Sequence, residues 1–157
     1  MELNPALEGP RPRRPLRIEP LRVYERWGDG HTVSRHCGTT PAVEADRLRR
    51  HPLLPATGSY PDVATAQRCV EACVAAHRLE VEGWRRAGYS RLVIDHDMGE
   101  VIGDVLVRKR WTAGDTTPLS ATAVRVVLRR CRRYPAGFAV LTSYPVLVTA
   151  RTYARRP

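Results

Sequence analysis

The chain has 157 residues, a length that fits one domain or one domain with a tail, and a formal net charge of +10. Its basic residues are arginines except for Lys109, and such an excess favours an anionic partner, nucleic acid first, although a GC-rich genome would produce it too. The chain has no run of about 18 apolar residues and no hydrophobic segment after the N-terminus, so we expect neither a membrane anchor nor a conventional signal peptide.

Residues 1–28 are rich in proline and arginine, and closely spaced prolines interrupt both helical and ladder hydrogen bonding. We therefore predict a linker or disordered arm over 1–28, in which Leu21, Val23 and Tyr24 could dock as a short extended piece. The globular domain is expected to cover 29–157.

The first half of this domain has helical signals. A short helix is expected over 31–37, and Pro41 at a first turn predicts a second helix reaching Arg49. Prolines and glycine then mark a loop over 52–61. Asp62 is suited to cap the longest helix, whose apolar residues keep helical spacing to about Arg86.

The second half has the alternation of strands. We predict strands over 92–94, 101–107, 121–128 and 137–144, with 146–149 extending or following the last one. Helices followed by antiparallel strands define the α+β class. The four cysteines lack paired zinc spacing, and small buried side chains are their expected role. Asp95, His96, Asp97 and Glu100 resemble a metal cluster, but they fall at an expected strand-to-strand turn.

The candidate chemistry lies in two segments far apart in the chain. Thr142 and Tyr144 are two residues apart on the last strand, so their side chains share one face. His36 lies eleven residues before Arg47. Cleavage of RNA by its own 2′-hydroxyl needs proton transfer and a fixed positive charge, which histidine and arginine can supply. Taken alone, His36 is better explained as a structural or exposed histidine.

Several segments carry a resemblance that covers about 30–146. They are 30–40 with its two histidines, 59–62 before the long helix, Trp84, the Ile102-Gly103 strand start, the strand 124–128 and the closing strand 137–145. In this order the segments resemble the ribonuclease A-like toxin domain, which forms the C-terminal part of bacterial contact-dependent inhibition and other polymorphic toxins. The resemblance implies a curved antiparallel sheet with N-terminal helices.

The resemblance also implies an activity: a metal-independent endoribonuclease without a cofactor, which leaves a 2′,3′-cyclic phosphate. His36 then matches the catalytic histidine, and Arg47 the following basic residue. Thr142 and Tyr144 match the hydroxyls of a Thr-x-Tyr-Pro ending. We expect His36 to transfer a proton, Arg47 to stabilise transition-state charge and Thr142 to position the phosphate. Tyr144 would bind a phosphate or a base, or assist proton transfer.

Substrate binding is expected from residues outside this set. His31 lies in the same motif as His36, and Lys109, Arg110 and Trp111 combine positive charge with an aromatic ring. The segment 129–134 has the same combination. Such pairings can hold a phosphate backbone and stack a base.

The expected partners are an RNA substrate and a cognate immunity protein, which the resemblance implies, and we expect a monomer that does not bind membranes. The domain would act in the cytoplasm, in a target cell after export by another component. Two alternatives remain open. A non-catalytic, basic nucleic-acid-binding module would bind RNA or DNA without His36. A degenerate toxin domain would serve as an interaction module.

Overall fold

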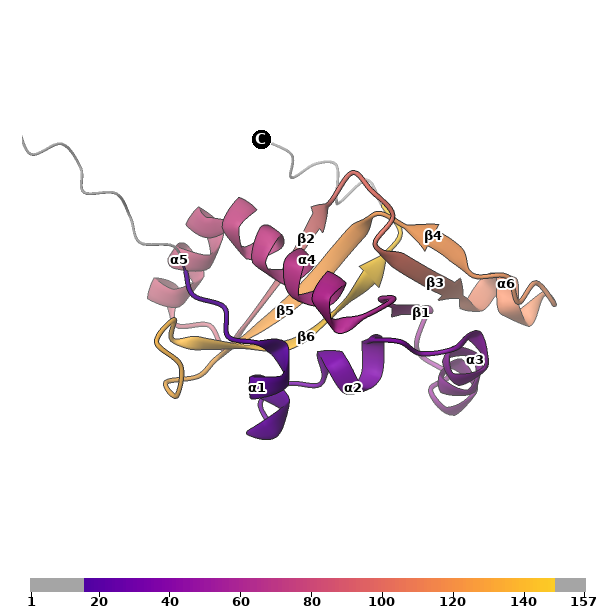
Figure 1. The fold of residues 1–157 in the computed structure, drawn as a ribbon, viewed down its shortest axis with the longest axis horizontal. Helices are drawn as coiled ribbons and strands as arrows, with labels where there is room; N and C mark the ends of the chain where they lie inside the picture. Colours follow the sequence, from indigo (N-terminus) through magenta and orange to yellow (C-terminus); the bar gives the residue numbers. More distant parts are fainter. Residues whose placement is uncertain (1–15, 149–157) are drawn as a thin grey trace, which may run out of the picture.

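The computed structural model describes residues 16–148, which fold into helices packed on antiparallel strands (Figure 1). The helices are α1 (Leu21–Arg26), α2 (Thr32–His36), α3 (Pro41–Arg50), α4 (Val63–Ala76), α5 (Arg78–Ala87) and α6 (Arg108–Thr112). The strands are β1 (Ala56–Ser59), β2 (Arg91–Asp97), β3 (Gly103–Val107), β4 (Leu119–Ala121), β5 (Ala123–Arg130) and β6 (Phe138–Val146). The α+β class predicted from the sequence is confirmed.

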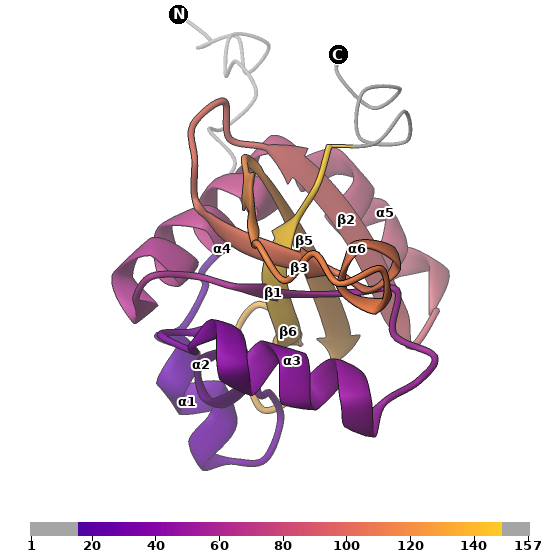
Figure 2. The same cartoon turned by 90° about the vertical axis from the view of Figure 1, so that its right-hand side faces the viewer.

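Within residues 16–148 the strands form two three-stranded antiparallel sheets, ordered β1-β3-β4 and β2-β5-β6, where one curved sheet was expected. The sheets meet where β1 crosses β6 (Figure 2). Gly58 lies against the main chain of Pro145 there, and a Cβ atom at Gly58 would overlap the Pro145 carbonyl oxygen. Glycine is therefore the residue that permits this crossing.

Alternation along β5 divides the second sheet into two faces. Val124, Val126 and Leu128 are buried, and α4 contacts their strand, so they belong to the core. Arg125, Val127 and Arg129 point to the opposite, less buried face. We call this second face the cleft face. A register shift near Val127 leaves one extra residue in β6, a β-bulge.

The N-terminal segment differs from the expected arm, because residues 21–26 form a helix that packs into the core. Leu21 and Tyr24 are buried, at 2% and 1% exposed. The Leu21 amide donates to the Gln67 side chain on α4. Pro20 lies just before the first turn of α1, a position where a proline does not interrupt helical hydrogen bonds. The prolines of this segment therefore do not prevent the helix. Residues 1–15 lie outside the described residues.

Four further elements differ from the sequence-based expectation. The long helix is divided at His77 into α4 and α5. The expected loop over 52–61 contains β1, which pairs with β3. The segment 108–112, expected as a basic stretch after a strand, is the short helix α6. The expected third strand is divided between β4 and β5.

All four cysteines are free thiols. Cys69 and Cys73 are fully buried in the core, in agreement with the expected role of small buried side chains. No helix within residues 16–148 combines the length and apolar character needed to cross a bilayer.

Candidate active site

One cavity of about 450 Å³ brings together the residues that the sequence singled out for catalysis. Its lining contains His36 from α2, Arg47 from α3, and Thr142 and Tyr144 from β6. His31, which precedes α2, lines it as well. Three chain segments therefore meet at one place, near the crossing of β1 and β6.

His36 is the last residue of α2 and is only 3% exposed. Its Nδ1 lies 2.9 Å from the carbonyl oxygen of Gly58. A carbonyl oxygen can only accept, so Nδ1 carries the proton and donates it. In the neutral ring, Nε2 then has a free lone pair and can act as a base. The end of α2 is fixed in turn by the Tyr60 amide, which donates to the His36 carbonyl oxygen at 2.7 Å.

Burial lowers the pKa of His36 to about 3, despite the opposing hydrogen bond to Gly58. The guanidinium of Arg47 adds to this lowering, since its Nη1 lies 3.3 Å from His36 Nδ1. A protonated ring would place two positive charges side by side here, so the contact disfavours an imidazolium. His36 is therefore neutral at pH 7 in the free protein. Phosphate bound beside Arg47 would raise the pKa again, because a nearby anion favours the charged ring.

The buried neutral His36 makes the fold sensitive to acid. Its folded-state pKa lies below the ordinary value of about 6.5, so as the pH falls the unfolded chain binds a proton first. Stability from this group is complete above pH 6.5 and is lost between about 6.5 and 3, at up to about 1.4 kcal/mol per pH unit. Urea unfolding at pH 6 and pH 4 should show a smaller loss for His36→Gln than for the wild type, by about 2 kcal/mol. Equal losses would mean that His36 is not buried in its neutral form.

Arg47 reaches the cavity from a well-capped helix. The Thr40 hydroxyl accepts a hydrogen bond from the Val43 amide and so caps α3. Arg47 Nη1 donates to the carbonyl oxygen of Arg35 at 3.3 Å, which ties α3 to α2. The pKa of Arg47 is lowered by burial, but an arginine remains charged under all ordinary conditions.

Tyr144 lies beside the histidine on the cleft face. Its ring centroid is 5.1 Å from that of His36. Its register partner on β5 is Arg125, whose guanidinium is held by two hydrogen bonds of 2.7 and 2.8 Å to the Asp95 carboxylate. The pKa of Arg125 is raised, first by Asp95 and further by Tyr144. Arg125 thus adds a second fixed positive charge to the cavity lining.

Sequence reasoning missed Arg125, Asp95 and Thr57 as site residues. An available signal was Arg125 as the one charged residue in the otherwise apolar run 123–128. Asp95, considered as part of a metal cluster, instead pairs with Arg125. Thr57 lines the cavity from β1. Within residues 16–148, the Oγ1 atoms of Thr57 and Thr142 are buried without a hydrogen-bond partner, so both can bind a group that enters the cavity.

Of the residues expected to bind substrate, His31 lines the cavity and the three on α6 do not. His31 joins the cavity: its amide donates to the Leu141 carbonyl oxygen at 3.0 Å, and its ring centroid is 6.4 Å from that of His36. Burial lowers the pKa of His31, with Arg35 and Arg47 adding to the effect. Lys109, Arg110 and Trp111 lie on α6 and are not among the residues that line this cavity. Arg110 pairs with Asp115.

The chemistry of this cavity suits a phosphate ester. Two guanidinium groups can bind its oxygens, and the hydroxyls of Thr57, Thr142 and Tyr144 can donate to them. A neutral imidazole beside these donors can accept a proton from an attacking hydroxyl.

Comparison with known proteins gives two findings. The family model described as "Bacterial CdiA-CT RNAse A domain" matches residues 30–145. A solved structure titled "Crystal structure of CdiA-CT/CdiI complex from Y. kristensenii 33638" is similar in fold, with a TM-score of 0.65 and 24% sequence identity. The similarity covers 74% of this chain and 99% of that one. The search of curated proteins gave no match.

Proposed function

Because this chain belongs to the bacterial CdiA-CT ribonuclease A domain family, we propose that it cleaves RNA without a metal ion, by attack of the 2′-hydroxyl on the adjacent phosphate. The observation that carries the proposal is the cavity itself. A neutral His36, the charged Arg47 and the hydroxyls of Thr142 and Tyr144 line one space, although they come from distant parts of the chain. A role in RNA binding alone would not need a buried histidine with a free Nε2.

In the first step, Nε2 of His36 takes the proton of the 2′-hydroxyl, and the 2′-oxygen forms a bond to phosphorus. The bond from phosphorus to the 5′-oxygen breaks, and this oxygen leaves with a proton from a second group. His31 and Tyr144 both line the cavity and can serve as that donor. The product has a 2′,3′-cyclic phosphate end.

The charge that develops on the phosphate oxygens is stabilised by Arg47. Its guanidinium lies next to His36, so an anion bound there also raises the basicity of the imidazole. Thr142 would position a non-bridging oxygen through its unpartnered hydroxyl. Lys109, Arg110 and Trp111 remain proposed contacts for more distant parts of the substrate.

The proposal includes a protein partner. The similar solved structure is a complex of CdiA-CT with CdiI, which supports a cognate immunity protein for this chain too. We further propose that the domain is a monomer and acts in the cytoplasm of a target cell, as expected of a contact-dependent inhibition toxin.

The test of the chemistry uses short RNA oligonucleotides in the presence of EDTA. We expect the wild type to cleave them and to leave 2′,3′-cyclic phosphate ends, detectable by mass spectrometry. An oligonucleotide with a single 2′-deoxynucleotide at the cleaved position should resist cleavage there, because the attacking hydroxyl is missing. Tight binding of RNA without cleavage would instead favour a nucleic-acid-binding module.

A further inference from the structure

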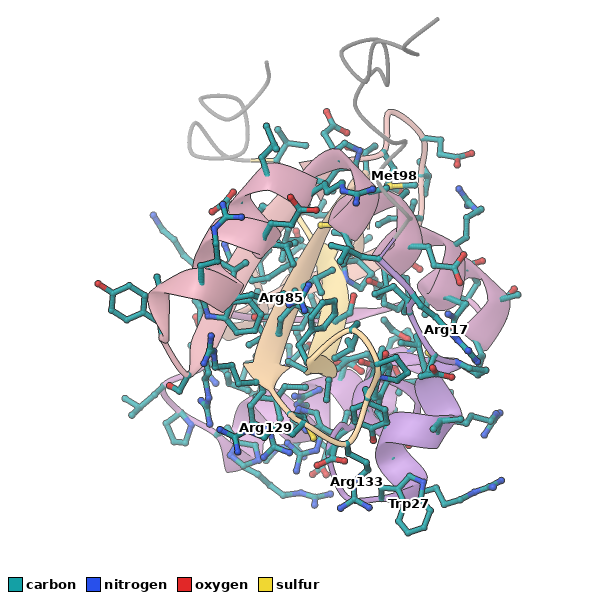
Figure 3. The ribbon with its side chains drawn as sticks, turned by 90° about the vertical axis from the view of Figure 1, so that its left-hand side faces the viewer. Arg17, Trp27, Arg85, Met98, Arg129 and Arg133 are labelled. Carbon is teal, nitrogen blue, oxygen red and sulfur yellow. The ribbon has the colours of Figure 1, made fainter. Side chains whose placement is uncertain are left out.

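An exposed tryptophan lies next to an arginine at the end of α1. Trp27 keeps 57% of its surface exposed, and the guanidinium of Arg133 lies 4.9 Å from the centre of its ring. Figure 3 shows the two side chains together at the lower edge of the molecule, with Arg129 nearby. An exposed indole beside a cation is typical of surfaces that stack bases and bind a phosphate backbone.

The pair is held in place by a buried carboxylate. Asp29 is 7% exposed and accepts hydrogen bonds of 2.7 Å from both Arg129 and the hydroxyl of Tyr134. Arg133 lies 3.4 Å from the same carboxylate. Two guanidinium groups face one carboxylate, so one positive charge remains uncompensated. Tyr134, an aromatic candidate in the sequence, is buried in this network, which leaves Trp27 as the ring available for stacking.

Strand geometry and chain length both place this pair close to the catalytic cavity. Arg129, which shares the Asp29 carboxylate with Arg133, points to the same cleft face of β5 as the cavity residue Arg125, about 13 Å farther along the strand. Trp27 precedes the cavity residue His31 by four residues, and a chain of that length spans at most about 14 Å. Stacked nucleotides advance about 3.4 Å per step, so about four steps at most cover this distance.

We propose that Trp27 and Arg133 form a binding subsite for RNA that flanks the cleaved bond. A base stacks on the indole of Trp27, and the guanidinium of Arg133 contacts a neighbouring phosphate. This inference rests on the proposed ribonuclease function. RNA is favoured over an acidic protein because the site combines an open ring with one uncompensated positive charge within a few nucleotides of the cavity.

The test compares two substrates in EDTA. One is a dinucleotide, which has a single cleavable bond and no nucleotide beyond the cleaved step to place on Trp27. The other is an RNA ten nucleotides long. Trp27→Ala should lower kcat/KM for the longer RNA about tenfold and leave that for the dinucleotide unchanged. Trp27→Phe should recover most of the loss, since it restores a stacking ring.

Two further variants sharpen the comparison. Tyr89→Ala removes another exposed aromatic residue, 71% exposed, and should leave both substrates unaffected. Arg133→Ala should weaken the salt dependence of long-RNA binding, with a slope of log K against log salt smaller by about 0.7. Circular dichroism of each variant identifies any that fails to fold.

Equal effects of Trp27→Ala on both substrates, or no effect on the longer one, would overturn the subsite and leave this surface to a protein partner. If the wild type cleaves neither substrate, the proposed function fails, and the subsite is then decided by binding. In that case, a fluorescent ten-nucleotide RNA should bind about tenfold more weakly to Trp27→Ala than to the wild type. Equal affinities would overturn the subsite in that case too.

Discussion

RNA cleavage by His36→Ala is expected to fall by about three orders of magnitude in kcat/KM, which is the contribution that a positioned general base commonly makes. The reason is specific to this ring: Nδ1 is committed to the Gly58 carbonyl oxygen, so Nε2 is the atom that can take the proton. The measurement is cleavage of a defined oligonucleotide in EDTA at pH 7, with the wild type alongside.

His51→Ala is the matched control for this variant. His51 is exposed at the end of α3, and its described hydrogen bonds use only the main chain, which the substitution keeps. It should retain wild-type activity. If His36→Ala kept more than a tenth of the activity while folding normally, His36 would not be the base, and the assignment would move to His31.

The second large effect is expected on stability. Gly58→Ala places a methyl group against the main chain of Pro145, where neither strand can move away without loss of its pairing. We expect the free energy of unfolding to fall by about 3 kcal/mol. The shift of β1 would also move the Gly58 carbonyl oxygen away from His36, so the folded fraction should lose activity.

Gly83→Ala is the matched control: it also replaces a glycine by alanine, but we expect it to raise stability. Gly83 lies inside α5, and a Cβ atom there meets no neighbour within 4 Å. Alanine is favoured over glycine in a helix by about 1 kcal/mol, so this variant should be slightly more stable than the wild type. Urea unfolding at pH 7 measures both variants. A Gly58→Ala protein as stable as the wild type would mean that β1 and β6 are not in close contact.

Local sequence patterns were sufficient for the parts of the fold that local rules govern. The proline in the first turn of α3 and the Asp62 cap of α4 are signals within one helical turn. The alternation in β5 likewise predicts a strand with two different faces. The helix α1 was missed because its burial depends on α4, more than forty residues away.

The candidate site, too, could be predicted only in part from the sequence. Motif resemblance pointed to His36, Arg47, Thr142 and Tyr144, and these residues do line one cavity. The pairing of Arg125 with Asp95 could not be predicted, because it depends on the register between β2 and β5. No sequence pattern linked Trp27 to Arg133, which are more than one hundred residues apart and come into contact only in the folded chain, where Asp29 also holds Arg133.

The position of β6 has a consequence for the cell that makes this protein. This strand supplies Thr142 and Tyr144, and its Leu141 carbonyl oxygen receives the amide of His31. During synthesis, the N-terminal part of a chain can fold before the rest has been made. The cavity, however, lacks one of its walls until the ribosome has translated β6. A growing chain therefore lacks the proposed cleavage site until nearly the whole of the matched domain has been made.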